Sequence, residues 1–180
     1  MLYTKGLWKS IEFIRQHLLE LPHPAALNYH TVYLLLALIL CIGGGAASGL
    51  ATPPGEWYAS LAKPTWAPPG WLFWPAWTLL YTLMAVAAWT VWRCRQQTSV
   101  RVPLTLFAVQ LALNFAWTPL LFGMHQPGFA LVEILVRLVA IIATIVSFAR
   151  VSAPAAWMMV PYCGWVFLVI VAQLGDLKLN

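Results

Sequence analysis

The sequence predicts an all-α integral membrane protein, a bundle of five transmembrane helices preceded by a short amphipathic N-terminal extension. Of its 180 residues, 62% are hydrophobic and only 8% are charged, whereas about 25% of the residues in a soluble domain are charged. Five apolar segments follow one another along the chain, and each has the ~20 residues that a helix needs to cross the hydrocarbon core. Because so few charges cannot cover a water-facing surface, we expect a lipid bilayer to surround the protein.

The N-terminal extension comprises residues 1–30. Its apolar residues recur at helical spacing, which predicts a short amphipathic helix on the membrane surface. A cleaved signal is the weaker interpretation, because Glu12 and Glu20 interrupt the region and no long apolar core with a cleavage site follows. A solvated tail without a function is the other alternative. Residues 31–180 then form a single membrane domain. The apolar positions of the extension are Leu7, Ile11, Ile14, Leu18 and Leu21.

The predicted spans are residues 31–51, 70–92, 102–122, 129–149 and 154–175. Five prolines in residues 52–69 exclude a long helix between the first two spans. In the first span, Gly45 and Gly49 form a GxxxG pattern, whose small face lets another helix approach closely. That helix belongs either to the same chain or to a second copy. We favour the same chain, because any helix bundle needs close contacts.

The loop charges predict how the bundle is oriented in the membrane. Of the lysines and arginines outside the spans, only Lys63 and Lys178 fall on the side opposite the N-terminus. By the positive-inside rule, the N-terminus and the loop at residues 93–101 are cytoplasmic. The loop at residues 52–69 and the C-terminus lie on the other side. The cations on the N-terminal side are Lys5, Lys9, Arg15, Arg93, Arg95, Arg101 and Arg150.

Polar residues inside two spans are candidates for structural or functional roles. Glu133 and Arg137 are spaced i, i+4 with the acid first, which suits an ion pair. We favour a structural pair over a proton relay, because no chain of further titratable groups accompanies it. Gln110, Asn114 and Trp117 share one face of the third span, and this face points into the bundle because amides avoid lipid. Interhelical hydrogen bonding and the polar edge of a ligand pocket both stay open.

Several kinds of site have no support in the residues. The three cysteines and four histidines show no ligand spacing, so we expect no metal site and no disulfide framework. No basic cluster is dense enough for nucleic acid. No nucleophile–base pair or phosphate loop is present, so the residues name no catalytic group.

Residues 57–92 hold seven of the eleven tryptophans. Tryptophan is typical of the interface between membrane and water. Seven exceed what such a belt needs, which predicts that some of them line a site for a flat apolar ligand, since an indole ring offers a large stacking face.

Three motifs resemble those of one family. The stretch WYASLAKPTWAPPGWLFWPAWTLLYTLM (57–84) resembles the signature of the TspO/translocator protein family, whose members are also called tryptophan-rich sensory proteins or peripheral benzodiazepine receptors. QLALNFAWTPLLFG (110–123) resembles the family's third-helix motif, and VPYCGWVF (160–167) resembles the opening of its fifth helix. The terminal Leu-Asn also fits. The resemblance covers residues 31–180.

The resemblance implies a five-helix bundle, often a homodimer, with a pocket beneath the first loop for porphyrins or related tetrapyrroles. Here the homodimer would use the small helix face at Gly45 and Gly49. No resident cofactor is implied; the porphyrin or haem-type tetrapyrrole is a ligand. After Trp165 the chain departs from the family's small-residue run, and Val169 replaces a small residue beside the pocket. Carried over by motif, the pocket residues are Trp57, Tyr58, Lys63, Trp66, Trp77, Tyr81, Gln110, Asn114, Trp117 and Trp165, with Val169 as the altered wall.

The function implied is a membrane receptor or sensor that binds tetrapyrroles or transports them. One alternative is light-dependent degradation of bound porphyrin, because Trp77 and Trp165 match tryptophans linked to that activity in some bacterial members. The other alternative is a protein that binds sterols or lipids, as animal members do. Helical spans favour a bacterial plasma or inner membrane, although the family also has members in outer membranes, including that of mitochondria.

Overall fold

The computed structural model describes residues 28–62, 64 and 68–179. The predicted amphipathic helix in the N-terminal extension, Lys63 and Trp66 therefore lie outside the described residues. The chain divides into two units, residues 1–32 and 33–180, and the helical bundle belongs to the second unit.

The described residues form five helical rods and one short helix, α4 (Glu56–Ser60), with no strand among them. The first rod is continuous from α2 (Tyr29–Leu38) through the π-helical turn η1 (Ile39–Gly43) into α3 (Gly44–Ala51). The second consists of η2 (Gly70–Leu72), α5 (Phe73–Arg93) and η3 (Cys94–Gln96). The third consists of α6 (Arg101–Thr118) and the π-helical turn η4 (Pro119–Gly123). The last two are α7 (Pro127–Ala149) and α8 (Ala153–Leu179).

All five rods are long and apolar enough to cross a membrane, which confirms the predicted fold class and a multi-pass integral membrane protein. The rods extend a few residues beyond the predicted spans. α7 begins at Pro127, two residues before the predicted fourth span, because a proline is well tolerated in the first turn of a helix. α8 continues to Leu179, four residues past the predicted end, which brings Asp176 onto the helix.

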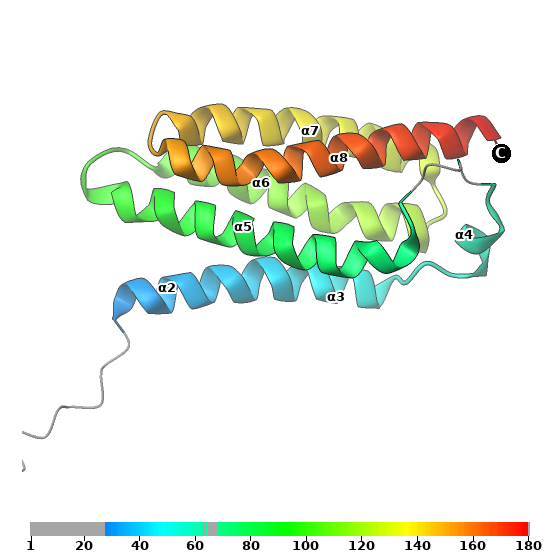
Figure 1. The fold of residues 1–180 in the computed structure, drawn as a ribbon, viewed down its shortest axis with the longest axis horizontal. Coiled ribbons are helices and arrows are strands. Elements are labelled where there is room, and N and C mark those ends of the chain that lie inside the picture. Colours follow the sequence, from blue (N-terminus) through cyan, green and yellow to red (C-terminus); the bar gives the residue numbers. More distant parts are fainter. Residues whose placement is uncertain (1–27, 63, 65–67, 180) are drawn as a thin grey trace, which may run out of the picture. The chain divides into compact units, whose positions relative to one another are not determined.

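The rods of residues 33–180 have an order that differs from their order in the chain. The first rod contacts both α5 and α6, α6 contacts α7, α7 contacts α8, and α8 returns to α5. Figure 1 shows the long helices side by side, with α4 and the C-terminal end of α8 at the same end of the bundle. The loop at residues 52–69 leaves the first rod at this same end of the bundle.

Small residues let the first rod approach its neighbours within the same chain. A Cβ atom on Gly44 would overlap the Phe115 ring, and one on Gly45 would overlap the Tyr81 ring. Ser48 donates a hydrogen bond of 2.7 Å to the carbonyl oxygen of Phe115. The GxxxG face thus packs inside the chain at Gly45, as we expected from the sequence. Nothing lies within 4 Å of a Cβ on Gly49.

At the C-terminal end of α5, tryptophans contact the arginines that follow them in the chain. The guanidinium carbon of Arg93 lies 4.8 Å from the Trp89 ring centroid, and that of Arg95 lies 3.6 Å from the Trp92 centroid. Cation–π pairs of this kind are worth about 0.5–1 kcal/mol at exposed sites. Tryptophan beside arginine is typical of the membrane interface, so we expect Trp89 and Trp92 to lie there, and neither lines the pocket described below.

Candidate ligand pocket

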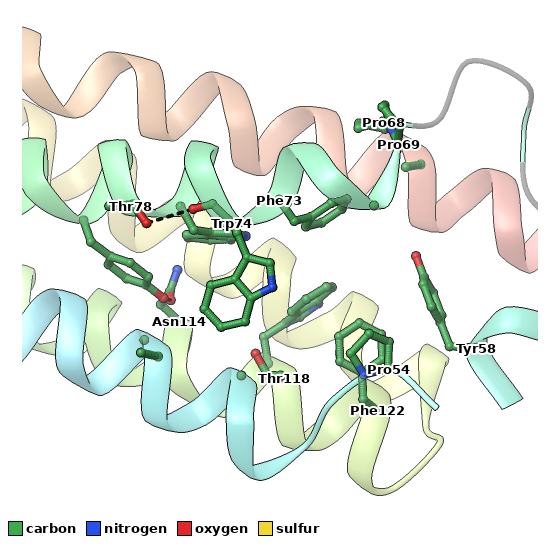
Figure 2. Close-up of a pocket in the computed structure, with 18 of the residues that line it drawn as sticks. Pro54, Tyr58, Pro68, Pro69, Phe73, Trp74, Thr78, Asn114, Thr118 and Phe122 are labelled. Atoms are coloured by element: carbon green, nitrogen blue, oxygen red, sulfur yellow. Dashed lines mark hydrogen bonds between the residues drawn. The ribbon is translucent and has the colours of Figure 1, made fainter. Parts of the chain in front are cut away.

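A cavity of about 500 Å³ lies between α3, α5, α6 and α8, at the end of the bundle that carries α4. Its volume falls in the range of small-molecule sites, about 300–1,000 Å³. Figure 2 shows Pro54, Tyr58 and Phe122 at one end of the cavity and Thr78 and Asn114 at the other. We call these the loop end and the deep end.

The α5 wall of the cavity is aromatic. Trp77 and Tyr81, one turn apart, stack with ring centroids 5.2 Å apart and an interplanar angle of 29°. Phe73, Trp74 and Thr78 lie on the same helix face and also line the cavity. Thr78 donates to the carbonyl oxygen of Trp74 at 2.9 Å, so its hydroxyl is satisfied within the helix. This wall offers flat apolar rings and little competing polarity.

The polar group at the deep end is Asn114, which is 3% exposed. Tyr81 donates its hydroxyl proton to Oδ1 of Asn114 at 2.5 Å. Nδ2 of Asn114 donates to the Tyr162 hydroxyl at 2.9 Å. Asn114 therefore ties α6 to α5 and α8 while it lines the cavity. Both roles left open by the sequence, interhelical bonding and a polar pocket edge, fall on the same side chain.

Trp117 continues the α6 wall of the cavity, and neighbouring side chains fix its position. Its Nε1 donates to Oε1 of Gln173 at 3.3 Å, and Nε2 of Gln173 donates to the carbonyl oxygen of Pro127 at 2.8 Å. The guanidinium carbon of Arg137 lies 5.7 Å from the Trp117 ring centroid. Nε of Arg137 lies 3.8 Å from Oε1 of Glu133, which confirms the predicted ion pair. Neither Glu133 nor Arg137 lines the described cavity.

The loop end of the cavity combines Tyr58 with Asp176. The Tyr58 ring packs edge-on against Phe122, with centroids 4.9 Å apart. Burial raises the pKa of the Tyr58 phenol, and the negative charge of Asp176 raises it further. Tyr58 thus stays a neutral phenol at physiological pH.

Comparison with known proteins identifies the family. A model of the TspO/MBR family matches residues 37–175, which is more than half of the chain. The chain belongs to the TspO/MBR family. It is 39% identical over 160 residues to the tryptophan-rich protein TspO of Chlorobaculum tepidum, a match that covers 86% of this chain and 99% of that protein. It is 45% identical over 112 residues to the translocator protein of Bos taurus, covering 61% of this chain and 66% of that protein. It is 36% identical over 143 residues to protein CrtK of Rhodobacter capsulatus, covering 79% of this chain and 89% of that protein.

Five of the residues carried over from the TspO/MBR resemblance line this cavity. They come from α4, α5 and α6, which are far apart in the sequence. They are Tyr58, Trp77, Tyr81, Asn114 and Trp117.

Four other predicted residues are not on the described wall. Trp57 stacks on His125 with centroids 4.5 Å apart, and Trp165 packs edge-on against Phe73 at 5.7 Å. Val169 is 7% exposed and packs in the hydrophobic core. Gln110 is fully buried among the helices, away from the cavity wall. A ligand role for these four residues stays a prediction.

The sequence analysis did not predict several parts of the wall. Ile42, Gly45, Ala46 and Gly49 line the cavity from the first rod; their i, i+3, i+4, i+7 spacing was visible, but small residues indicate helix packing first. Trp74 and Thr78 lie on the same face of α5 as Trp77 and Tyr81, so the helical spacing could have predicted that they line the cavity. Asp176 gave no signal, because it fell beyond the predicted fifth span and just past the family match.

Proposed function

We propose that this TspO/MBR-family chain is a membrane receptor that binds a porphyrin or related tetrapyrrole in the cavity, as a sensor or as a transporter. The observation that carries the proposal is the stacked Trp77–Tyr81 wall with one buried amide, Asn114, at its deep end. A tetrapyrrole is a large flat aromatic ring, and offset stacking on aromatic side chains is worth about 0.5–1.5 kcal/mol per pair beyond burial.

The surroundings of the wall support a rigid site. Tyr81, Asn114 and Tyr162 form one hydrogen-bonded chain across three helices. Side chains that are locked before binding lose less conformational entropy when a ligand arrives. The wall therefore suits a rigid planar ligand better than a flexible acyl chain.

We further propose that the protein lies in a bacterial plasma or inner membrane with its N-terminus in the cytoplasm, and that it forms a homodimer. Orientation rests on the asymmetry of the loop cations. Many apolar side chains of the first rod are exposed, among them Ile39 and Leu50 at 67% and 68%, so this rod retains an apolar outer face for lipid or for a second copy. Gly45 is already engaged with Tyr81, so the dimer would use other positions than the predicted small face.

The test is a titration of the purified protein in detergent with protoporphyrin, followed by quenching of tryptophan fluorescence. We expect saturable quenching, and we expect Trp77→Ala to weaken the affinity roughly tenfold through the loss of stacking area. Trp157→Ala is the matched control, because Trp157 is 72% exposed on α8 and is not on the described wall. Equal effects of the two substitutions would contradict the proposed site. Binding of cholesterol without saturable binding of porphyrin would favour the sterol alternative.

Light-dependent degradation of the bound porphyrin is a second candidate function. It is favoured by Trp77, whose indole lines the cavity. The same samples are illuminated and the porphyrin absorption bands recorded. Loss of the bands in wild-type protein that is abolished by Trp77→Phe, with binding retained, would assign that activity. Loss at the same rate in Trp77→Phe would mean that the porphyrin bleaches without help from this indole.

A further inference from the structure

We infer that the ligand enters and leaves the cavity laterally from the lipid bilayer, through an opening between α3 and α5. The residues that border it are Ala46 and Gly49 of α3 and Trp74 and Thr78 of α5, all of which line the cavity. We call this place the α3–α5 opening. The inference rests on the proposed function and adds the class of ligand that the site takes, a molecule dissolved in the membrane and not one free in water.

The first observation is the separation of the two helices. A Cβ atom on Gly45 would overlap the Tyr81 ring, so α3 and α5 are in close contact there. Gly49 lies one turn further along α3, and a Cβ atom on it would meet nothing within 4 Å. The close approach at Gly45 therefore does not extend to Gly49, which is one turn nearer the loop end.

The second observation is that two residues of α5 face the cavity and the outside at once. Trp74 lines the cavity although it is 59% exposed, and Thr78 lines the cavity and is exposed as well. Figure 2 shows both residues on the α5 side of the cavity. They belong to a rod that is long and apolar enough to cross a membrane, so the surface that they expose faces lipid. The cavity thus reaches the lipid-facing surface of the bundle at these two residues.

The chemistry of the α3–α5 opening suits passage from a membrane. The Thr78 hydroxyl donates to the carbonyl oxygen of Trp74 at 2.9 Å, so it needs no water to satisfy it. The Trp74 indole is in the first turn of α5, and indoles favour the boundary between hydrocarbon and headgroups because they have apolar faces and a polar edge. A tetrapyrrole has the same division of polarity, so it concentrates in the leaflet at the depth of this opening.

The loop end offers a route through water, but ring contacts hold α4 in place there. Trp57 stacks on His125 with centroids 4.5 Å apart. Tyr58 packs edge-on against Phe122 with centroids 4.9 Å apart. Both contacts would have to break for α4 to move away from the cavity. At the α3–α5 opening, rotation of the exposed Trp74 side chain is enough, because the residues of α3 that border the opening are small, and exposed side chains change rotamer rapidly.

The experiment closes each route in turn with a reducible bridge between two cysteines. In a background without the three native cysteines, one protein carries Gly49→Cys with Trp74→Cys across the α3–α5 opening. The matched control carries Trp57→Cys with His125→Cys at the loop end, where neither residue lines the described cavity. Each pair is joined in lipid nanodiscs by a bifunctional methanethiosulfonate reagent, which a reductant removes. Protoporphyrin is supplied in lipid vesicles, and quenching of tryptophan fluorescence gives the association and dissociation rate constants.

We expect the bridge across the α3–α5 opening to slow association and dissociation by about tenfold, because it closes the gate through which the ligand passes, and we expect reductant to restore both rates. The bridge at the loop end should leave both rates unchanged. Rates that the first bridge does not change, or that the second slows as much, would overturn the inference alone. Failure of the wild type to bind protoporphyrin at equilibrium would overturn the proposed function, and the inference with it.

A single substitution tests the same inference without a bridge. Trp74→Ala should raise the association rate constant about threefold, because it widens the gate, whereas the loss of a contact in the bound state alone acts mainly on dissociation. Trp71→Ala is the matched control, because Trp71 is 74% exposed on the same rod and does not line the described cavity. Thermal unfolding of both variants checks that the fold is retained. Association that is no faster in Trp74→Ala than in Trp71→Ala would contradict entry through the α3–α5 opening.

Discussion

At the scale of the residue, buried polar side chains join neighbouring helices through hydrogen bonds. Asn114 accepts from Tyr81 and donates to Tyr162, so one amide orders three helices around the cavity. In hydrocarbon an unsatisfied polar group is costly, and interhelical bonds of this kind contribute about 0.6–2 kcal/mol each. The position of Asn114 on the wall therefore couples the stability of the helix junction to the shape of the pocket.

The residue-scale prediction concerns this junction. We expect Asn114→Leu to lower the thermal unfolding midpoint in detergent by the equivalent of about 2 kcal/mol, because it leaves two buried hydroxyls without their partner. Tyr81→Phe removes one bond of the chain and should cost about half as much. A Tyr81→Phe effect as large as that of Asn114→Leu would show that Asn114 does not join the two tyrosines.

At the scale of the element, the first rod serves two purposes with one face. Gly44 and Gly45 allow close contact with Phe115 and Tyr81, and Gly45 and Gly49 form part of the cavity wall. Small residues suit both purposes, because the same lack of side chain that admits a neighbouring ring also leaves space for a ligand. The π-helical turn at Ile39–Gly43 directly precedes this face, and such turns often occur at functional sites.

The element-scale prediction separates packing from binding. Gly45→Ala should destabilise the protein by about 1–3 kcal/mol, because its Cβ meets the Tyr81 ring in a packed junction. Gly49→Ala should leave stability unchanged or raise it slightly, since its Cβ meets nothing within 4 Å and alanine favours the helix. Thermal unfolding in detergent measures both. Equal unfolding midpoints for the two variants would contradict the close approach at Gly45.

At the scale of the whole molecule, charge and helix order have separate effects. The cations on one side of the spans predict the orientation in the membrane, whereas the order of the rods in residues 33–180 brings the first rod, α5, α6 and α8 together around the cavity. Orientation then decides on which side of the membrane the loop end of the pocket lies.

The whole-molecule prediction concerns this orientation. In a background free of Cys41, Cys94 and Cys163, Ser60→Cys should react with a membrane-impermeant maleimide in intact bacterial cells. Ser99→Cys should react only after the membrane is opened, because the positive-inside rule places the loop at residues 93–101 in the cytoplasm. Both serines are exposed, and α4 and the connection from α5 to α6 lie at opposite ends of the bundle (Figure 1). The reverse labelling pattern would show that the loop cations do not set the topology.

The sequence by itself determined the class and length of the elements. Apolar segments of about 20 residues with few charges have one stable form in a bilayer, the helix, because every backbone group must be satisfied internally. The i, i+4 spacing of Glu133 and Arg137 fixed their pairing for the same local reason, and the tryptophan-rich motif indicated the family. These are properties of neighbouring residues, which a sequence displays directly.

Only the tertiary structure decided which side chains share the cavity. Trp57 belongs to the same motif as Tyr58 and Trp77, yet Trp57 packs on His125 while the other two line the wall. Trp165, from the fifth-helix motif, packs on Phe73 and does not line the wall. Asp176 reaches the loop end only because α8 continues to Leu179 and packs beside α5. Membership of the wall depends on helix order and rotation, which arise from contacts between residues far apart in the chain and leave no local pattern in the sequence.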